Sequence, residues 1–196
     1  MTITLRPHQQ RGTDRMAEYN KGQLIFPTGA GKTLTAIMDA KRVFETATSH
    51  KTIVIVAPRI LLAEQLCSEF LEVIKRNDVH VMHVHSGETS YFGTTKVKQI
   101  QMHDSICKTA GEHQIIFTTY NSLGRLMDAE IEVDTIYFDG HITVWNVIFS
   151  LQLSISVRRQ NVAISSLRLV RLRSLLPNQA WICLLYTSDA ADERNS

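Results

Sequence analysis

The sequence is poor in cysteine and in long apolar runs. Its three cysteines, Cys67, Cys107 and Cys183, have no paired spacing, which excludes a disulfide framework and indicates a reducing compartment. No apolar run reaches the length of a membrane-spanning helix, and the N-terminus carries no signal pattern. We therefore expect a cytoplasmic protein with no membrane partner.

A strong charge imbalance is also absent. The net charge is +2, with 21 Lys and Arg against 19 Asp and Glu. This mildly basic balance permits a nucleic-acid partner without requiring one. A length of 196 residues with 44% hydrophobic content fits one domain with a real core, or one domain and a tail.

The largest local absence lies between His141 and Ile182. This segment contains no Asp, Glu, Lys, Gly, Met or Tyr, and its only charged residues are arginines. Folded surfaces usually mix charges of both signs, so the segment is untypical of folded protein. A basic RNA-binding tail is one interpretation, but the many Leu, Ile and Val residues argue against a solvated tail. We favour a shifted reading frame.

Back-translation supports a one-base deletion at the codon after Asp139. When the last base of each codon is read with the first two of the next, residues from Gly140 to Asn146 permit Ala-His-Asn-Ser-Val-Glu. This restores Asp-x-Ala-His, and the same shift over 163–169 permits Tyr-Phe-Phe-(Ser/Thr)-Ala-Thr. We predict that residues 140–182 are frameshifted. Resequencing the source DNA tests this, because an intact open frame over Gly140–Ile182 would contradict it.

The C-terminal segment has a different expected origin. Residues from Cys183 to Glu193 match what a common transposase-based sequencing adapter encodes in one frame. A natural polar C-terminus is the alternative. We predict that residues 183–196 are adapter-derived and that the C-terminal part is non-native, so the fold is predicted from residues 1–139.

Residues 1–139 alternate between strand-like and helix-like segments. Such alternation is typical of an α/β fold, a mainly parallel sheet with helices on both faces. Ligands of these sheets bind at the carboxyl ends of the strands. We expect strands at 23–26, 51–57, 79–85, 114–118 and 134–139, and helices at about 8–20, 33–46, 60–76 and 94–108.

The most informative motif is Phe26-Pro-Thr-Gly-Ala-Gly-Lys-Thr33, between an apolar run and a helical pattern. Its glycines allow backbone N–H groups to turn inward, and the following helix adds the positive end of its dipole. We expect Thr28, Gly29, Ala30 and Gly31 to cradle phosphates. Lys32 would reach the β- and γ-phosphates of ATP, and Thr33 would bind Mg²⁺. The strict pattern has glycine where Phe26 stands, so the alternative is an ordinary glycine-rich turn.

Five further segments, in their order and spacing, resemble the first motor domain of superfamily-two helicases. The similarity is greatest to the DEAH-like branch of restriction-enzyme motor subunits and excision-repair helicases. It implies a RecA-like P-loop domain that uses ATP and Mg²⁺ to move on nucleic acid, with DNA favoured over RNA. The segments are Leu5-Arg-Pro-His-Gln9, Ala57-Pro-Arg-Ile-Leu-Leu-Ala-Glu-Gln65, His85-Ser-Gly87, Thr118-Thr-Tyr-Asn-Ser-Leu123 and Ile136-Tyr-Phe-Asp139.

The resemblance assigns roles in ATP binding. Gln9 matches the glutamine that reads the adenine edge, and Arg6 either supports it or simply starts a helix before proline. Asp139 matches the aspartate that holds Mg²⁺, commonly through water, with a turn or helix cap as the alternative. Lys32 and Asp139 are thus the expected catalytic residues.

The resemblance also implies a nucleic-acid contact. Two segments match those that grip the sugar–phosphate backbone of one strand, so we expect little base specificity. Local caps and helix starts are the alternative. The residues concerned are Pro58, Arg59, Gln65, Thr118, Thr119 and Tyr120.

One position departs from the resembled family. Directly after the aspartate, the resembled family has a glutamate that polarises the attacking water, whereas this chain has Gly140. We expect ATP binding with very poor hydrolysis, and a chain that stops before the second motor domain and its arginine finger. A P-loop kinase or other nucleotide-binding enzyme, and a non-enzymatic nucleotide-binding fragment, are the rival functions.

Three histidines on one expected strand have the spacing H-x-x-H-x-H. Strand alternation places His83 and His85 on one face and His80 on the other. Because no cysteine or fourth ligand lies nearby, we expect ordinary strand and loop histidines and no metal site.

Overall fold

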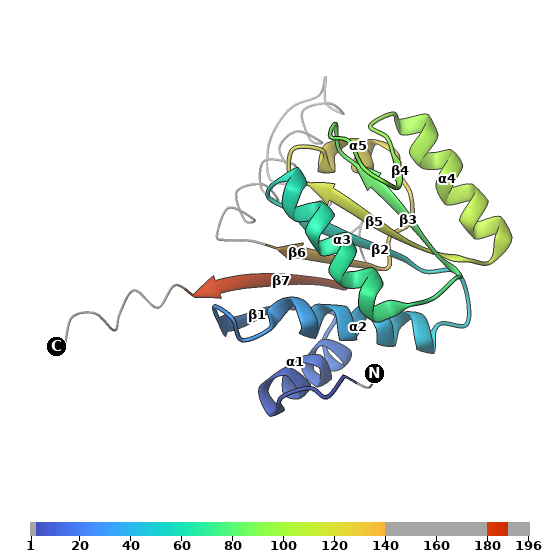
Figure 1. Ribbon diagram of the computed structural model, residues 1–196. Helices are drawn as coiled ribbons and strands as arrows, with labels where there is room; N and C mark the ends of the chain where they lie inside the picture. The colour runs from blue at the N-terminus through green and yellow to red at the C-terminus, as the bar shows by residue number, and fades with distance from the viewer. Residues whose placement is uncertain (1–2, 140–179, 188–196) are drawn as a thin grey trace, which may run out of the picture.

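The computed structural model describes residues 3–139 and 180–187, and its strands and helices alternate along the chain (Figure 1). The strands are β1 (Lys21–Pro27), β2 (Thr52–Ala57), β3 (Val79–Val84), β4 (Phe92–Gly93), β5 (His113–Thr119), β6 (Thr135–Asp139) and β7 (Ala180–Thr187). The helices are α1 (Pro7–Glu18), α2 (Lys32–Thr46), α3 (Ile60–Ile74), α4 (Val97–Ala110) and α5 (Leu123–Asp128). No helix of the described ranges is long and apolar enough to cross a bilayer.

All strand pairs in the described sheet are parallel. The strand order is β1-β7-β6-β2-β5-β3-β4. The carboxyl ends of parallel strands meet at one edge, so the segments that follow β1, β2, β3, β5 and β6 share that edge. The predicted α/β fold with a parallel sheet is confirmed.

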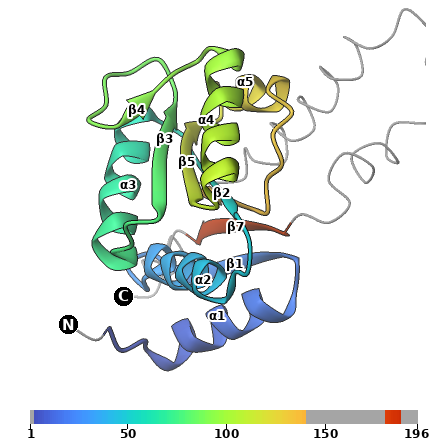
Figure 2. The ribbon, with the colours of Figure 1, turned by 90° about the vertical axis from the view of Figure 1, so that its right-hand side faces the viewer.

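The core has one layer on each face of the sheet, and these two layers bury the central strand β2 on both sides. Ile53 and Ile55 pack into the layer formed with α2 and α3, whereas Val54 and Val56 pack into the layer formed with α4 and α5. Figure 2 shows these helix pairs on opposite sides of the sheet. The continuous apolar run Thr52–Ala57 therefore specifies a strand in the middle of a three-layer domain.

Three elements were not predicted from the sequence. β4 has two residues and α5 has six, which is too short for hydrophobic periodicity to reveal. β7 lies between β1 and β6 and pairs with both. It begins in the segment predicted to be frameshifted and ends in the one predicted to be adapter-derived. The origins of residues 140–182 and 183–196 remain predictions, and most of both segments lies outside the described residues.

Candidate nucleotide and nucleic-acid site

The phosphate loop connects β1 directly to α2. Gly29 and Gly31 both adopt left-handed backbone conformations, with φ of 76° and 82°, which side chains other than glycine's disfavour. The Ala30 N–H donates to the Pro27 carbonyl at 3.2 Å, which curls the loop back over the end of β1. α2 begins at Lys32, so the N–H groups of its first turn, which have no acceptor within the helix itself, lie next to this curl. The loop therefore has the backbone shape of a phosphate cradle.

The Lys32 side chain folds back against the loop rather than into solvent. Its side chain is buried, and Nζ donates to the carbonyls of Phe26 at 2.8 Å and Pro27 at 3.1 Å. Burial lowers the pKa of Lys32, and the negative charge of Asp139 opposes this shift. Asp139 ends β6 and is 1% exposed. The structure thus brings the two expected catalytic residues together, with the half-buried Thr33 in the first turn of α2.

Gln9 reaches the same loop from α1. Its Nε2 donates to the Ala30 carbonyl at 3.1 Å, and its Oε1 accepts the Arg6 N–H at 2.9 Å. His8 Nε2 also lies 3.0 Å from the Ala30 carbonyl. Arg6 precedes Pro7 at the start of α1, as an ordinary helix start would. Gln9 is therefore next to the phosphate loop, with both polar atoms of its amide engaged within the chain.

Alanine at Gly31 is expected to disturb this arrangement more than alanine at Gly29. Both substitutions strain a left-handed backbone, by about 1–2 kcal/mol. A Cβ at Gly31 would also come within 2.1 Å of Gln9 Nε2, whereas none of the described atoms lies within 4 Å of a Cβ at Gly29. Because Nε2 is the far end of a flexible side chain, Gln9 can turn away at small cost, so we expect Gly31→Ala to weaken ATP binding only a few-fold more than Gly29→Ala. Fluorescence titration with an ATP analogue measures this, and equal effects would contradict it.

The expected nucleic-acid residues follow adjacent strands at the same edge of the sheet. Ala57 pairs with Thr119 at the ends of β2 and β5, and the Tyr120 N–H donates to the Ala57 carbonyl at 3.2 Å. Pro58 and Arg59 are exposed just before α3. The segments after β2 and β5 therefore form one continuous surface.

The side chains on this surface differ in exposure. Gln65 is exposed and donates to Glu69 at 2.8 Å. Thr118 and Thr119 are buried, and the Thr118 hydroxyl donates to the Val84 carbonyl at 2.8 Å. Tyr120 is half-buried, and its hydroxyl donates to the Asp139 carbonyl at 2.8 Å. The structure therefore places Pro58, Arg59 and Gln65 at the surface and the Thr118 side chain inside the sheet.

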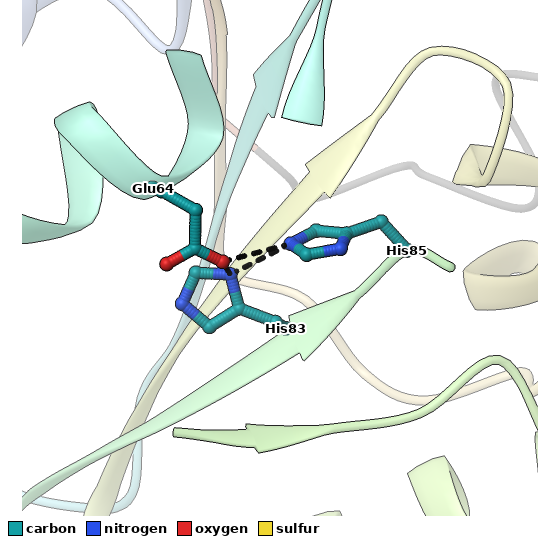
Figure 3. Close-up of side chains that lie close together, drawn as sticks. All are labelled: Glu64, His83 and His85. Carbon is teal, nitrogen blue, oxygen red and sulfur yellow. Dashed lines mark hydrogen bonds and ion pairs between the residues drawn. The ribbon is translucent and has the colours of Figure 1, made fainter. Parts of the chain in front are cut away.

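The histidine pair at the end of β3, His83 and His85, has a neighbour that the sequence pattern did not reveal. His83 and His85 lie on one side of the strand, as predicted, and Glu64 of α3 points at both rings (Figure 3). The expectation that no further ligand group lies nearby is wrong, because Glu64 approaches through packing of a helix on the sheet, which sequence spacing does not reveal. His80 lies apart, with Glu112 at 2.5 Å. Burial lowers the pKa of His83 to about 4.

Comparisons with known proteins identify the family. The family described as type III restriction enzyme, res subunit, matches residues 2–146. A comparison with curated protein sequences finds no match. Similar solved structures include a nuclease-deletion mutant of the Type ISP restriction-modification enzyme LlaGI in complex with a DNA substrate mimic, with 19% identity and a TM-score of 0.63. The UvsW helicase from bacteriophage T4 has 16% identity and a TM-score of 0.60.

These alignments cover most of this chain but a smaller share of each similar structure. Both alignments cover 95% of this chain, but they cover only 17% of the LlaGI chain and 53% of the UvsW chain. At these identities the likeness shows the fold, and it confirms the expected helicase-like motor domain fold. The family match is independent of it, extends over most of the chain and includes the phosphate loop. The chain belongs to the type III restriction enzyme res subunit family.

Proposed function

We propose that the chain is the ATP-binding half of a nucleic-acid-dependent helicase or translocase, an ATP hydrolase by family. One observation carries the proposal. The phosphate loop after β1, the buried Asp139 at the end of β6 and the segments after β2 and β5 share one edge of a parallel sheet. Nucleotide and nucleic acid would therefore bind to connected parts of one surface.

The residues of the loop fit MgATP. Backbone N–H groups of Thr28–Gly31 and the start of α2 would hold the phosphates, and Lys32 would exchange its two carbonyl partners for phosphate oxygens. Thr33 and Asp139 would hold Mg²⁺, Asp139 through water. Bound MgATP supplies the phosphoanhydride bond whose cleavage drives movement. Gln9 would read adenine after its Nε2 releases the Ala30 carbonyl.

Arg59 is the leading candidate for contact with a phosphate of the track. It is exposed at the start of α3, beside Pro58 and nearly two turns before the exposed Gln65. Residues Thr118–Tyr120 would support this contact from the adjacent strand end. We propose DNA as the track, since LlaGI is described in complex with a DNA substrate mimic, and a second similar structure, the ATP-dependent Type ISP restriction-modification enzyme LlaBIII, is described as bound to DNA.

Tyr120 provides a physical link between the two functions. It belongs to the proposed nucleic-acid segment, and its hydroxyl donates to the carbonyl of the proposed Mg²⁺ aspartate, Asp139, at 2.8 Å. Movement of the segment after β5 would therefore shift the end of β6. Such a contact fits a motor in which nucleotide and nucleic acid both favour one closed arrangement.

Stimulation of ATP hydrolysis by single-stranded DNA tests the proposal. The experiment uses the product of the uninterrupted gene, with an Arg59→Ala variant as the matched comparison. We expect stimulation that weakens as salt rises and is reduced in the variant, because phosphate contacts are salt-dependent. Turnover that DNA does not change, with phosphate transferred to a small acceptor, would instead support the P-loop kinase, which family membership does not favour.

A further inference from the structure

Glu64, His83 and His85 form a compact cluster between α3 and β3, away from the phosphate loop. In the strand order, β7, β6, β2 and β5 separate β3 from β1. The three side chains converge on one point, with the carboxylate coming from the helix and the imidazoles from the strand and the residue after it (Figure 3). Glu64 and His85 belong to two of the segments that carry the family resemblance, but the proposed motor function assigns no role to these three side chains.

The spacing of the three donor atoms matches that of ligands around one metal ion. His83 Nδ1 lies 3.0 Å from His85 Nε2, and Glu64 Oε1 lies 3.2 Å from the first and 3.3 Å from the second. Ligands at about 2.0–2.1 Å from a zinc ion in tetrahedral geometry are about 3.3–3.4 Å apart. The same bond lengths at an angle of about 95° give about 3.0 Å. The three donor atoms are therefore spaced like one triangular face of a coordination shell.

The two imidazoles are held in place by their surroundings. His83 is fully buried and His85 is 3% exposed. The His83 ring stacks on Phe117, with centroids 5.4 Å apart, and on Tyr91 at 5.9 Å. Such packing fixes ligand orientation before an ion arrives, which reduces the free-energy cost of binding.

The carboxylate oxygen of this cluster lacks a conventional hydrogen bond. Among the described residues, Glu64 Oε1 is a buried oxygen that no hydrogen bond reaches, although both imidazoles lie within ion-pair distance. A buried oxygen without a hydrogen-bond donor is unusual, and it destabilises the fold unless a ligand or a water molecule binds it. The Glu64 side chain is 28% exposed overall, so the cluster lies near the surface of the domain.

We propose that Glu64, His83 and His85 bind one divalent transition-metal ion of the Zn²⁺ class. Two nitrogen donors and one carboxylate suit zinc or cobalt, whereas Mg²⁺ prefers oxygen ligands. The ion would fasten α3 to the segment after β3. That segment already packs closely, since a Cβ at Gly87 would come within 2.6 Å of Ile60 Cγ2. The site is therefore structural, and it stiffens the start of α3 that carries Arg59.

Binding requires a proton shift on His85 and the loss of two hydrogen bonds. The Gly87 N–H donates to His85 Nδ1 at 3.2 Å, which places the His85 proton on Nε2, where it is donated to His83 Nδ1 at 3.0 Å. An ion at Nε2 requires the proton to move to Nδ1, so both the Gly87 contact and the hydrogen bond between the imidazoles must break. Histidine tautomers give distinct nitrogen shifts in NMR spectra. We expect ion binding to switch His85 to the Nδ1–H tautomer and to shift the Gly87 amide.

The test is Co²⁺ binding by the whole metal-stripped chain, without nucleotide, followed by visible absorption and calorimetry. We expect binding at one ion per chain with the absorption of a tetrahedral site, displacement by Zn²⁺ but not Mg²⁺, and an increase in Tm. Glu64→Gln keeps the shape of the side chain and is expected to weaken binding at least about 100-fold, as loss of a direct ligand exceeds the 10–100-fold typical of supporting groups.

His80→Gln is the matched control, because this partly exposed histidine lies on the same strand but outside the cluster. It should leave Co²⁺ affinity within about twofold, and circular dichroism with EDTA present establishes that each variant is folded. Equal Co²⁺ affinity of the unmodified chain and Glu64→Gln, or a folded unmodified chain that binds no Co²⁺, would overturn the proposal. Neither result depends on ATP or DNA binding, so failure here leaves the motor function untouched.

Discussion

Replacing Lys32 by alanine is expected to weaken MgATP binding about 10- to 150-fold. A hydrogen bond to a charged group contributes about 1.5–3 kcal/mol, which corresponds to this range. Lys32 begins α2 at the end of the phosphate loop, where the residue is buried and its ammonium group donates to the carbonyls of Phe26 and Pro27. Titration with a fluorescent ATP analogue measures the loss.

Lys41→Ala is the control for this substitution. Lys41 lies on the same helix, where its ammonium group is 3.9 Å from Glu45 in a partly exposed ion pair. Its removal should change ATP affinity by less than about twofold, because exposed ion pairs contribute little. Equal ATP affinity of Lys32→Ala and the unmodified chain, with both folded, would show that the loop does not use this lysine for phosphate.

ATP turnover is expected to depend even more strongly on the residue after Asp139. Glycine has no group that can polarise water, and loss of a positioned base commonly lowers rates by about 10²–10⁴. In the product of the uninterrupted gene, replacing the expected glutamate with glycine should reduce phosphate release by this factor and leave ATP affinity nearly unchanged. Gly140 itself lies outside the described residues, so the expectation rests on sequence.

Gly140→Glu in the present chain provides the complementary measurement. We expect turnover to remain low, because the resembled family completes its site with an arginine from the second motor domain. Phosphate release from the unmodified chain at the rate of an intact relative would contradict both expectations. It would show that this chain hydrolyses ATP without a glutamate at that position.

The parts of the fold set by local pattern could be predicted from the sequence. The side chains of β2 point alternately into the two core layers. A short, uninterrupted run of β-branched apolar residues is what such a buried central strand requires, and it is visible in the sequence. The loop at 26–33 combines glycines, a lysine and a helix start within a few residues, and its backbone conformation follows from that local chemistry. Features with such short-range causes are visible in a single sequence.

Features that depend on how a helix packs on the sheet could not be predicted. Glu64 meets His83 and His85 only because α3 lies against β3. The Thr118 hydroxyl was expected at the nucleic-acid surface, but hydrogen bonding to Val84 keeps it inside the sheet. Gln9 was expected near adenine, and its contact with Ala30 depends on where α1 docks. In each case the partner is distant in the chain, and a single sequence carries no signal for it.

Nucleotide selectivity is the most direct test of the central claim that residues 26–33 hold the phosphates of ATP. The measurement is displacement of a fluorescent ATP analogue from the folded chain by ATP, ADP and AMP, with and without Mg²⁺. We predict one saturable site that Mg²⁺ strengthens, and displacement by ATP and ADP but not by AMP, because Lys32 and the loop bind the β- and γ-phosphates. A folded chain that shows no saturable binding, or that binds AMP as tightly as ATP, would contradict the claim.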